Sequence, residues 1–135
     1  MDQKVERLFR EKNLIFIATI NLDGSPHLTP VWGDYQDGHV LVNTAEGRIK
    51  HRNVLHDSRV AVSVVSDDNP LDMTTIRGHV VDIISDYDYT HADKLAKKYM
   101  DLSKYPFKRI NEKRIIFKIK PEHVYVLPTI NMNQG

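Results

Sequence analysis

The chain has 135 residues, no cysteine and a formal net charge of +1 at pH 7. This length fits a single domain, residues 1–135, and leaves too little apolar area for a second core. Without cysteine there is no disulfide, thiolate metal ligand or cysteine nucleophile, and the balanced charge argues against binding nucleic acid through its backbone. The lack of an apolar leader or a long apolar run predicts a cytoplasmic protein that does not enter a membrane.

Turn residues and apolar periodicity divide the chain into short strands with helices between them. Helices are predicted over residues 3–12, from Gly47 to about 55, and from a capping box at Ser85–Asp88 to about Met100. Strands are predicted over residues 14–21, 26–35, 39–44, 59–65, 72–84, 113–120 and 123–127. Residues 128–135 are predicted to form a frayed tail.

Turn signals at Asp23-Gly24, Asp37-Gly38 and Pro121-Glu122 separate neighbouring strands. Pro30 lacks an N–H, which indicates a sheet edge, a bulge or a place where something other than a neighbouring strand approaches. Gly78 indicates a bulge or the close approach of another backbone. This hairpin-rich order predicts a mainly β fold, in which an antiparallel barrel, closed or partly open, carries peripheral helices.

Basic side chains gather where the second helix begins, at Arg48, Lys50, His51 and Arg52. A helix N-terminus already carries about half a positive charge, so an exposed cation there destabilises the helix by roughly 0.3–1 kcal/mol. The hydroxyl of Thr44 precedes the same turn. These features make sense together if an anion such as a phosphate binds there. The alternative is a solvated basic helix face that binds nothing.

Trp32, the single tryptophan, follows Pro30 in the stretch 26–32. It could form a platform beside a flat ligand, but the general tendency of tryptophan to be buried favours a place in the barrel core. Arg77 could reach an anion, although a salt bridge to Asp82 or to an acidic loop is the favoured expectation.

No residue pattern predicts a metal site or an activated nucleophile. His51 and His56 do not share a helix face, and the acidic group Asp67, Asp68 and Asp72 lacks the spacing of a calcium loop. Nucleophile-elbow, Walker and dinucleotide motifs are missing as well, so any chemistry is expected to come from a bound cofactor.

Several motifs follow one another along the chain. They are Asp23-Gly-Ser-Pro-His-Leu-Thr-Pro-Val-Trp32, Thr44-Ala-Glu-Gly-Arg-Ile-Lys-His-Arg-Asn53, Asp57-Ser-Arg-Val-Ala61, Asn69-Pro70, Ile76-Arg-Gly78, Leu95-Ala-Lys-Lys-Tyr99 and Tyr105-Pro106. With these motifs the chain, from Leu14 to Leu127, resembles the pyridoxamine 5′-phosphate oxidase-like, FMN-binding split-barrel superfamily. It is most similar to the short-chain branch that includes F420-dependent reductases.

The resemblance implies a six-stranded antiparallel split barrel that forms a homodimer with two cofactor sites at the interface. The implied cofactor is FMN, or alternatively F420, with its phosphate held by Arg48 and Lys50. The other cofactor-binding residues implied by position are Thr44 and Asn53 near the phosphate, Thr29, Pro30, Val31 and Trp32 along the ring, and Arg77 with the segment Asp67–Asp72 reaching across from the other subunit.

The expected function is that of an oxidoreductase whose bound ring exchanges a hydride with a small organic substrate, while the protein supplies binding and orientation. No catalytic residue is assigned. The alternative is a non-catalytic flavin-binding or flavin-storage protein on the same fold. A nucleic-acid-binding barrel of the OB type is disfavoured by the balanced charge.

Two features bear on the choice within the superfamily. Synthesis of pyridoxal phosphate is not expected, because His27-Leu28 stands where those oxidases carry an arginine and because the chain ends soon after Leu127. The basic stretch Lys104–Arg114 could meet the acidic oligoglutamate tail of F420, although such stretches are usually solvated.

Overall fold

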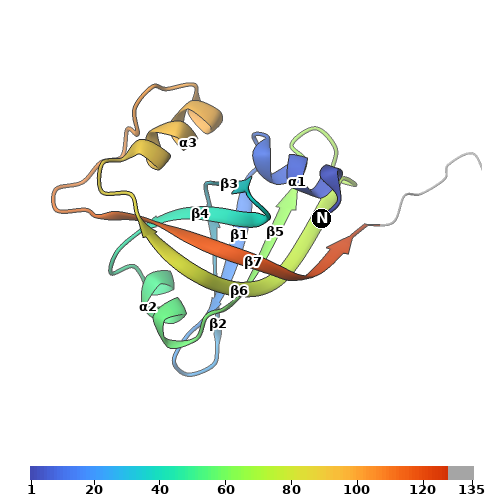
Figure 1. Cartoon of the computed structure of the whole chain (residues 1–135), viewed down its shortest axis with the longest axis horizontal. Coiled ribbons are helices and arrows are strands. Elements are labelled where there is room, and N and C mark those ends of the chain that lie inside the picture. Colours follow the sequence, from blue (N-terminus) through green and yellow to red (C-terminus); the bar gives the residue numbers. More distant parts are fainter. Residues whose placement is uncertain (128–135) are drawn as a thin grey trace, which may run out of the picture.

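The computed structural model describes residues 1–127, which form one antiparallel sheet with three helices at its margins (Figure 1). The helices are α1 (Gln3–Arg10), α2 (Ile49–His56) and α3 (Thr90–Met100). The strands are β1 (Ile15–Ile20), β2 (Pro26–Val31), β3 (Gly33–Gln36), β4 (His39–Ala45), β5 (Arg59–Val65), β6 (Met73–Ser85) and β7 (Arg114–Val126). The predicted tail, residues 128–135, lies outside the described residues.

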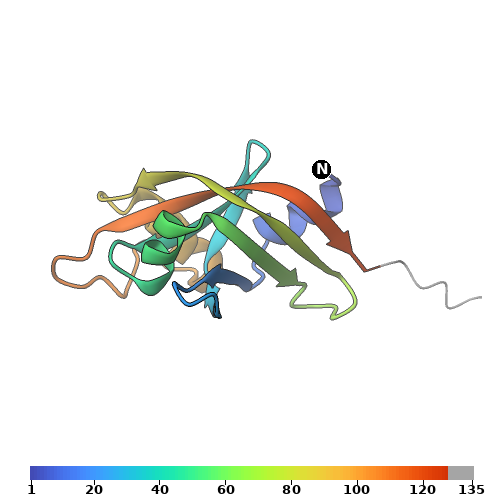
Figure 2. The same cartoon turned by 90° about the horizontal axis from the view of Figure 1, so that it is seen from below.

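The described strands pair in the order β2-β1-β5-β6-β7-β4-β3, so that β2 and β3 are the two edges of the sheet. These two edges are consecutive in the chain and are separated only by Trp32, so the sheet curls back on itself (Figure 2). The Asn43 N–H donates to the Trp32 carbonyl at 3.1 Å, which ties this corner to β4. The prediction of a mainly β, antiparallel fold is confirmed, with seven strands where the resemblance implied six.

The apolar core lies on the inner face of the curled sheet. Ile17, Val62 and Phe117 are at most 1% exposed, because alternate side chains of each strand point to the same face. Val5 and Phe9 of α1 are fully buried against this core. The other two helices, α2 and α3, lie at the end of the molecule where β6 ends and β7 begins (Figure 1). None of the helices within residues 1–127 has the length and apolarity to span a membrane.

The predicted strand over 26–35 is divided at Trp32, and Pro30 lies inside β2 opposite Phe16. Since β2 pairs only with β1, a residue without an N–H is tolerated there. The prediction that Pro30 marks a sheet edge is therefore confirmed, but the break in the strand comes two residues later.

The long hairpin of β6 and β7 differs from the prediction at Pro121-Glu122. This dipeptide does not turn the chain, and β7 runs through it as one strand of 13 residues. Arg77 pairs with His123 and Gly78 pairs with Pro121, which leaves Glu122 as the extra residue of a bulge. A Cβ atom on Gly78 would lie 2.0 Å from a carbonyl oxygen of β7, so the predicted close backbone approach at Gly78 is confirmed.

The start of α3 also differs from the prediction, since Ser85 ends β6 and the helix begins at Thr90. Asp86 replaces the expected capping box: its two carboxylate oxygens accept the N–H groups of His91 at 2.8 Å and Ala92 at 2.9 Å. The capping residue was misassigned because Ser85, the first residue of the capping pattern, is still the last residue of β6.

Candidate functional site

The start of α2 carries positive charge and no acidic residue of its own. Gly47 turns the chain at a φ of +81°, and Arg48 is the N-cap residue of the helix. No side chain caps α2, and its first turn holds neither Asp nor Glu. The unpaired N–H groups and the basic side chains therefore add their positive potentials in one place.

Arg114, at the start of β7, joins Arg48 and Lys50, and these three side chains are called the basic cluster. The Nε of Arg114 donates to Oδ1 of Asn43 at 2.9 Å. The Glu112 carboxylate lies 3.3 Å from Nη1 of Arg114 and 3.5 Å from Nη2 of Arg48. Within residues 1–127, Glu112 is the one carboxylate that forms an ion pair with the basic cluster.

Lys50 is the most isolated charge of the basic cluster. It is only 8% exposed, and burial lowers the pKa of its ammonium group, followed by repulsion from Arg48 and then from Arg114. Its ammonium group forms no ion pair and no hydrogen bond with any residue in the described part of the chain. A desolvated cation beside two others is costly unless an anion joins it, so this group fits a phosphate.

Four aromatic side chains form a second group, the aromatic cluster: Trp32, Tyr99, Tyr105 and Phe107. The rings of Trp32 and Tyr99 are stacked at 5.2 Å, and Tyr105 meets Trp32 edge-on at 6.1 Å. The guanidinium of Arg114 lies over the Tyr105 ring at 4.9 Å. The aromatic and basic clusters are therefore in direct contact through this cation–π pair.

Trp32 is half-buried and does not belong to the barrel core, so the favoured expectation for it is wrong. The chain passes from one sheet edge to the other at this residue, and its ring packs against α3 instead. Beside it lies a groove of about 320 Å³ lined by Leu14, Pro30, Val31, Trp32, Tyr105 and Phe107. This lining includes three of the four residues predicted along the ring.

Thr29, the fourth of these residues, lies in the middle of β2. It pairs with Ile17, so its side chain is on the inner face of the edge strand. The Thr29 hydroxyl and Nδ1 of His27, two residues earlier, are buried without a hydrogen-bond partner in the described chain. Buried polar atoms without partners are uncommon and point to a ligand or to ordered water.

Thr44 and Asn53 are both buried, at 4% and 7% exposure. The Asn53 amide donates to Oγ1 of Thr19 at 3.0 Å and to Oδ1 of Asn21 at 2.8 Å. Both amide hydrogens of Asn53 therefore tie α2 to the end of β1 and to the residue that follows it. Asn53 lies on the buried side of α2, and both of its amide hydrogens are already donated within the protein.

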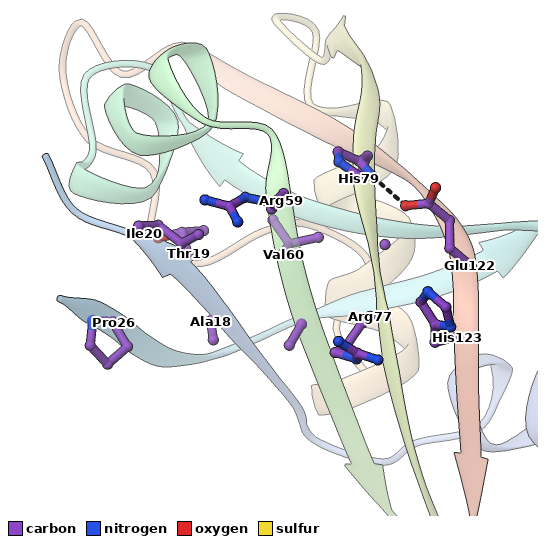
Figure 3. A pocket seen from close by; sticks show the side chains of 12 residues that line it. Ala18, Thr19, Ile20, Pro26, Arg59, Val60, Arg77, His79, Glu122 and His123 are labelled. Atoms are coloured by element: carbon purple, nitrogen blue, oxygen red, sulfur yellow. Dashed lines mark hydrogen bonds and ion pairs between the residues drawn. The ribbon is translucent and has the colours of Figure 1, made fainter. Parts of the chain in front are cut away.

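Arg77 lies apart from the basic cluster, on the outer face of the sheet. It borders the outer-face pocket, a hollow of about 440 Å³ with an apolar floor that includes Ala18 and Val60 (Figure 3). Ionisable side chains surround this floor, namely Arg59, Arg77, His79, Glu122 and His123. The ion pairs within residues 1–127 include none from Arg77, so the favoured expectation of a salt bridge to Asp82 or to an acidic loop is wrong. The Asp82 carboxylate accepts the N–H of Ile83 at 2.9 Å.

Comparison with known proteins identifies the family. The family model described as pyridoxamine 5′-phosphate oxidase matches residues 1–128. The chain belongs to this family. No curated protein is similar enough to be matched to it.

Solved structures agree with the family assignment. A structure named F420 Reductase shares 27% sequence identity over 93% of this chain and 98% of its own, with a TM-score of 0.81. General Stress Protein 26 from Bacillus anthracis (17% identity, 91% and 90% covered, TM-score 0.65) has the same fold. So does a putative pyridoxamine 5′-phosphate oxidase from Lactobacillus delbrueckii, which shares 18% identity over 93% of this chain and 93% of its own, with a TM-score of 0.58. The predicted split-barrel class is thereby confirmed.

Sequence reasoning missed Asn43, Glu112 and Arg114 in this member of the pyridoxamine 5′-phosphate oxidase family. Arg114 was included only as the end of a basic stretch expected to be solvated, yet its side chain is 9% exposed. It is 71 residues away from its partner Asn43, so no local pattern could indicate their contact. The only available signal was an arginine near the start of a predicted strand.

Proposed function

We propose that this chain binds a phosphate-bearing redox ring, FMN or F420, and serves as an oxidoreductase for a small organic substrate. One observation carries the proposal: at the open N-terminus of α2, Arg48 and Arg114 share the carboxylate of Glu112, and the buried Lys50 beside them forms no ion pair within residues 1–127. Such a site favours a multivalent anion, and its contact with an aromatic cluster supports a ring attached to that anion.

The residues of the chain have distinct roles in this proposal. Arg48 and Lys50 hold the phosphate through charge-assisted hydrogen bonds, and the buried Thr44 lies next to them in sequence at the end of β4. Asn53 positions α2 through its bonds to β1.

The ring is held by the other group of residues. Thr29 offers its partnerless hydroxyl, and Pro30, Val31 and Trp32 provide an apolar wall that excludes water. When bound, the ring supplies the hydride chemistry, and the protein supplies orientation and a dry surface.

A second copy of the chain is proposed to cover the outer face of the sheet. Exposed apolar side chains follow one another across neighbouring strands of this face, at Leu14, Phe16, Leu28, Val65 and Tyr125. In such a homodimer, Arg77 and the segment Asp67–Asp72 approach the cofactor of the other subunit. Light scattering should give the mass of a dimer, and Phe16→Glu should reduce it to that of a monomer.

Cofactor titration tests the proposal and separates its two forms. The similarity to the structure named F420 Reductase supports F420, while the phosphate site suits either cofactor. Protein stripped of bound small molecules is titrated with FMN and with F420 by calorimetry and visible absorbance. Binding of one cofactor at micromolar concentration is expected, and failure of both would remove the proposal.

Turnover distinguishes the enzyme from the alternative of a flavin-binding or flavin-storage protein. The loaded protein is mixed with the reductant appropriate to its cofactor and with quinone, enone or nitro acceptors, and the absorbance of the ring is followed. Acceptor-dependent reoxidation is expected for the enzyme. Tight binding without any reoxidation would support storage instead.

A further inference from the structure

Glu112 puts a carboxylate in contact with two of the cations that would bind the phosphate. One oxygen lies 3.3 Å from Nη1 of Arg114 and the other lies 3.5 Å from Nη2 of Arg48, so one anion bridges two guanidinium groups. Only 6% of the Glu112 side chain is exposed. The bridge is therefore shielded from water, and any other anion must compete with Glu112 for these cations.

The bridge is loose enough to be exchanged. Charge-assisted hydrogen bonds between N–H and carboxylate are typically about 2.7–2.9 Å long, and both contacts of Glu112 exceed this range. The Arg48 side chain is also 45% exposed, so it can reorient. A phosphate group carries close to two negative charges near neutral pH and offers more acceptor oxygens than a carboxylate.

Arg114, in contrast, is fixed in place. Its Nε donates to Oδ1 of Asn43 at 2.9 Å, and Nδ2 of Asn43 donates in turn to Oδ2 of Asp86 at 3.0 Å. The ring of Tyr105 covers one face of the guanidinium at 4.9 Å. Because these contacts orient Arg114 without using all of its five N–H groups, an incoming phosphate meets a preorganised donor.

We propose that Arg114 is a third phosphate-binding side chain, and that Glu112 is an internal competitor which the phosphate displaces from Arg48 and Arg114. The inference rests on the proposed function for the identity of the anion. Glu112 belongs to the segment that joins α3 to β7 (Figure 1). The rings of Tyr105 and Phe107, in the same segment, pack on Trp32. Displacement of Glu112 therefore changes the surroundings of the single tryptophan.

The test compares FMN with riboflavin, which has the same ring and no phosphate. The wild type, Glu112→Gln and the control Glu11→Gln are titrated with each flavin, and flavin fluorescence reports binding. Glu112→Gln should bind FMN about tenfold more tightly, the scale of one charge-assisted contact, with riboflavin affinity unchanged. Glu11→Gln removes the same charge on α1, where Glu11 pairs with Arg7, and should match the wild type for both flavins.

Inorganic phosphate provides a second probe, read by the fluorescence of Trp32. Phosphate should alter this fluorescence at lower concentration in Glu112→Gln than in the wild type. Glu112→Asp, which keeps the charge but withdraws it by one methylene, should be intermediate, and it replaces Glu112→Gln if that variant does not fold. Arg114→Met should weaken FMN binding about tenfold and leave riboflavin binding unchanged.

The outcomes separate this inference from the proposed function. If no flavin or deazaflavin binds but phosphate still binds more tightly to Glu112→Gln, the proposed function fails and the competition stands. If FMN binds and Glu112→Gln has equal or weaker affinity than the wild type, the competition is overturned and the proposed function stands. If phosphate and FMN bind equally to every variant, both the competition and the role of Arg114 are overturned.

Discussion

The basic cluster and the outer-face pocket both contain arginine, but their charges are balanced differently. In the outer-face pocket, Arg59 pairs with Asp57 at 2.7 Å, and His79 is hydrogen-bonded to Glu122. In the basic cluster, Arg48 and Arg114 share one carboxylate, and the buried Lys50 forms no ion pair within residues 1–127. The pocket is a hollow of about 440 Å³, yet the buried cation that forms no ion pair within residues 1–127, Lys50, lies elsewhere. Uncompensated buried charge is therefore a better guide to an anion site than volume.

The two regions also differ in what holds their backbone. The outer-face pocket lies over the bulge at Gly78, where two strands approach so closely that a Cβ atom has no room. The basic cluster is assembled from a turn, a helix start and a strand start. Substitutions in the pocket should therefore affect folding, whereas substitutions in the basic cluster should affect binding.

The largest effect is expected from Arg48→Ala combined with Lys50→Ala. A hydrogen bond to a charged group contributes about 1.5–3 kcal/mol, so the loss of two should weaken FMN or F420 binding by about 3–6 kcal/mol. Calorimetric titration measures this loss. Thermal unfolding should change little, because both removed cations oppose the dipole of α2.

Arg59→Ala in the outer-face pocket is the matched control for this double variant. Its guanidinium is paired with Asp57 and 65% exposed, so cofactor affinity should stay within about twofold of the wild type. An equal loss of affinity in both variants would mean that the pocket, rather than the start of α2, receives the phosphate.

Gly78→Ala should have the largest effect on folding. The new methyl group would lie 2.0 Å from a carbonyl oxygen of β7, and separating the two strands should cost about 3 kcal/mol of unfolding free energy. Urea titration measures the loss. Gly24→Ala is the control: its φ is +85° with no atom near the added methyl group, so only about 1–2 kcal/mol of backbone strain is expected. Equal losses in both variants would show that the close approach does not constrain the hairpin.

The sequence was informative wherever a local pattern determines the structure. Hairpin signals at Asp23-Gly24 and Asp37-Gly38 lie between paired strands, and Gly78 marks the bulge. The same reasoning failed at Pro121-Glu122. There β7 stays paired with the 13-residue strand β6 on both sides of the dipeptide, and this pairing outweighs the local turn propensity. The sequence also could not show that Trp32 leaves the core, because that depends on where the two sheet edges meet.

Only the part of the candidate site that lies in one short stretch of sequence could be predicted. Arg48 and Lys50 stand together at a helix start, so one short motif predicted them. Asn43, Glu112 and Arg114 are brought together by the pairing of β4 with β7 and by the loop after α3, which no local pattern records. The salt bridge expected from Arg77 to Asp82 could not be judged from their spacing, because two register shifts of the β6–β7 pairing lie between these residues and Arg77 borders the outer-face pocket.

Lys98 shows how a buried lysine behaves when the protein itself satisfies it. Its Nζ donates to the carbonyl oxygens of Phe9 and Gly33 at 2.6 Å each, and burial lowers its pKa from 10.5 to about 8. Between these values the unfolded chain binds more protons than the folded one, so stability increases with pH. From pH 8 to 10 the unfolding free energy should rise by about 2 kcal/mol from this group.

Urea titrations across this range measure the rise, and Lys98→Met should abolish it. The exposed Lys97 pairs with Asp101 on the surface, so Lys97→Met should keep the rise. Burial raises the pKa of Tyr99 to about 12, so its opposite contribution is confined to pH above 10. A flat profile in the wild type would mean that Lys98 stays protonated in the folded state.

Lys50→Met should have the smallest effect on unfolding free energy, and the sign of this effect should depend on whether phosphate is present. Unlike Lys98, Lys50 forms no hydrogen bond to a carbonyl group in the described chain, and its ammonium is repelled by Arg48 and Arg114. Removing that charge while keeping the length of the side chain should raise the unfolding free energy at pH 7 by about 1 kcal/mol. Saturating phosphate should reverse the order, because it stabilises the wild type more than the variant. If Lys50→Met were less stable than the wild type without phosphate, Lys50 would already be satisfied by the protein, and the contrast with the outer-face pocket would lose its basis.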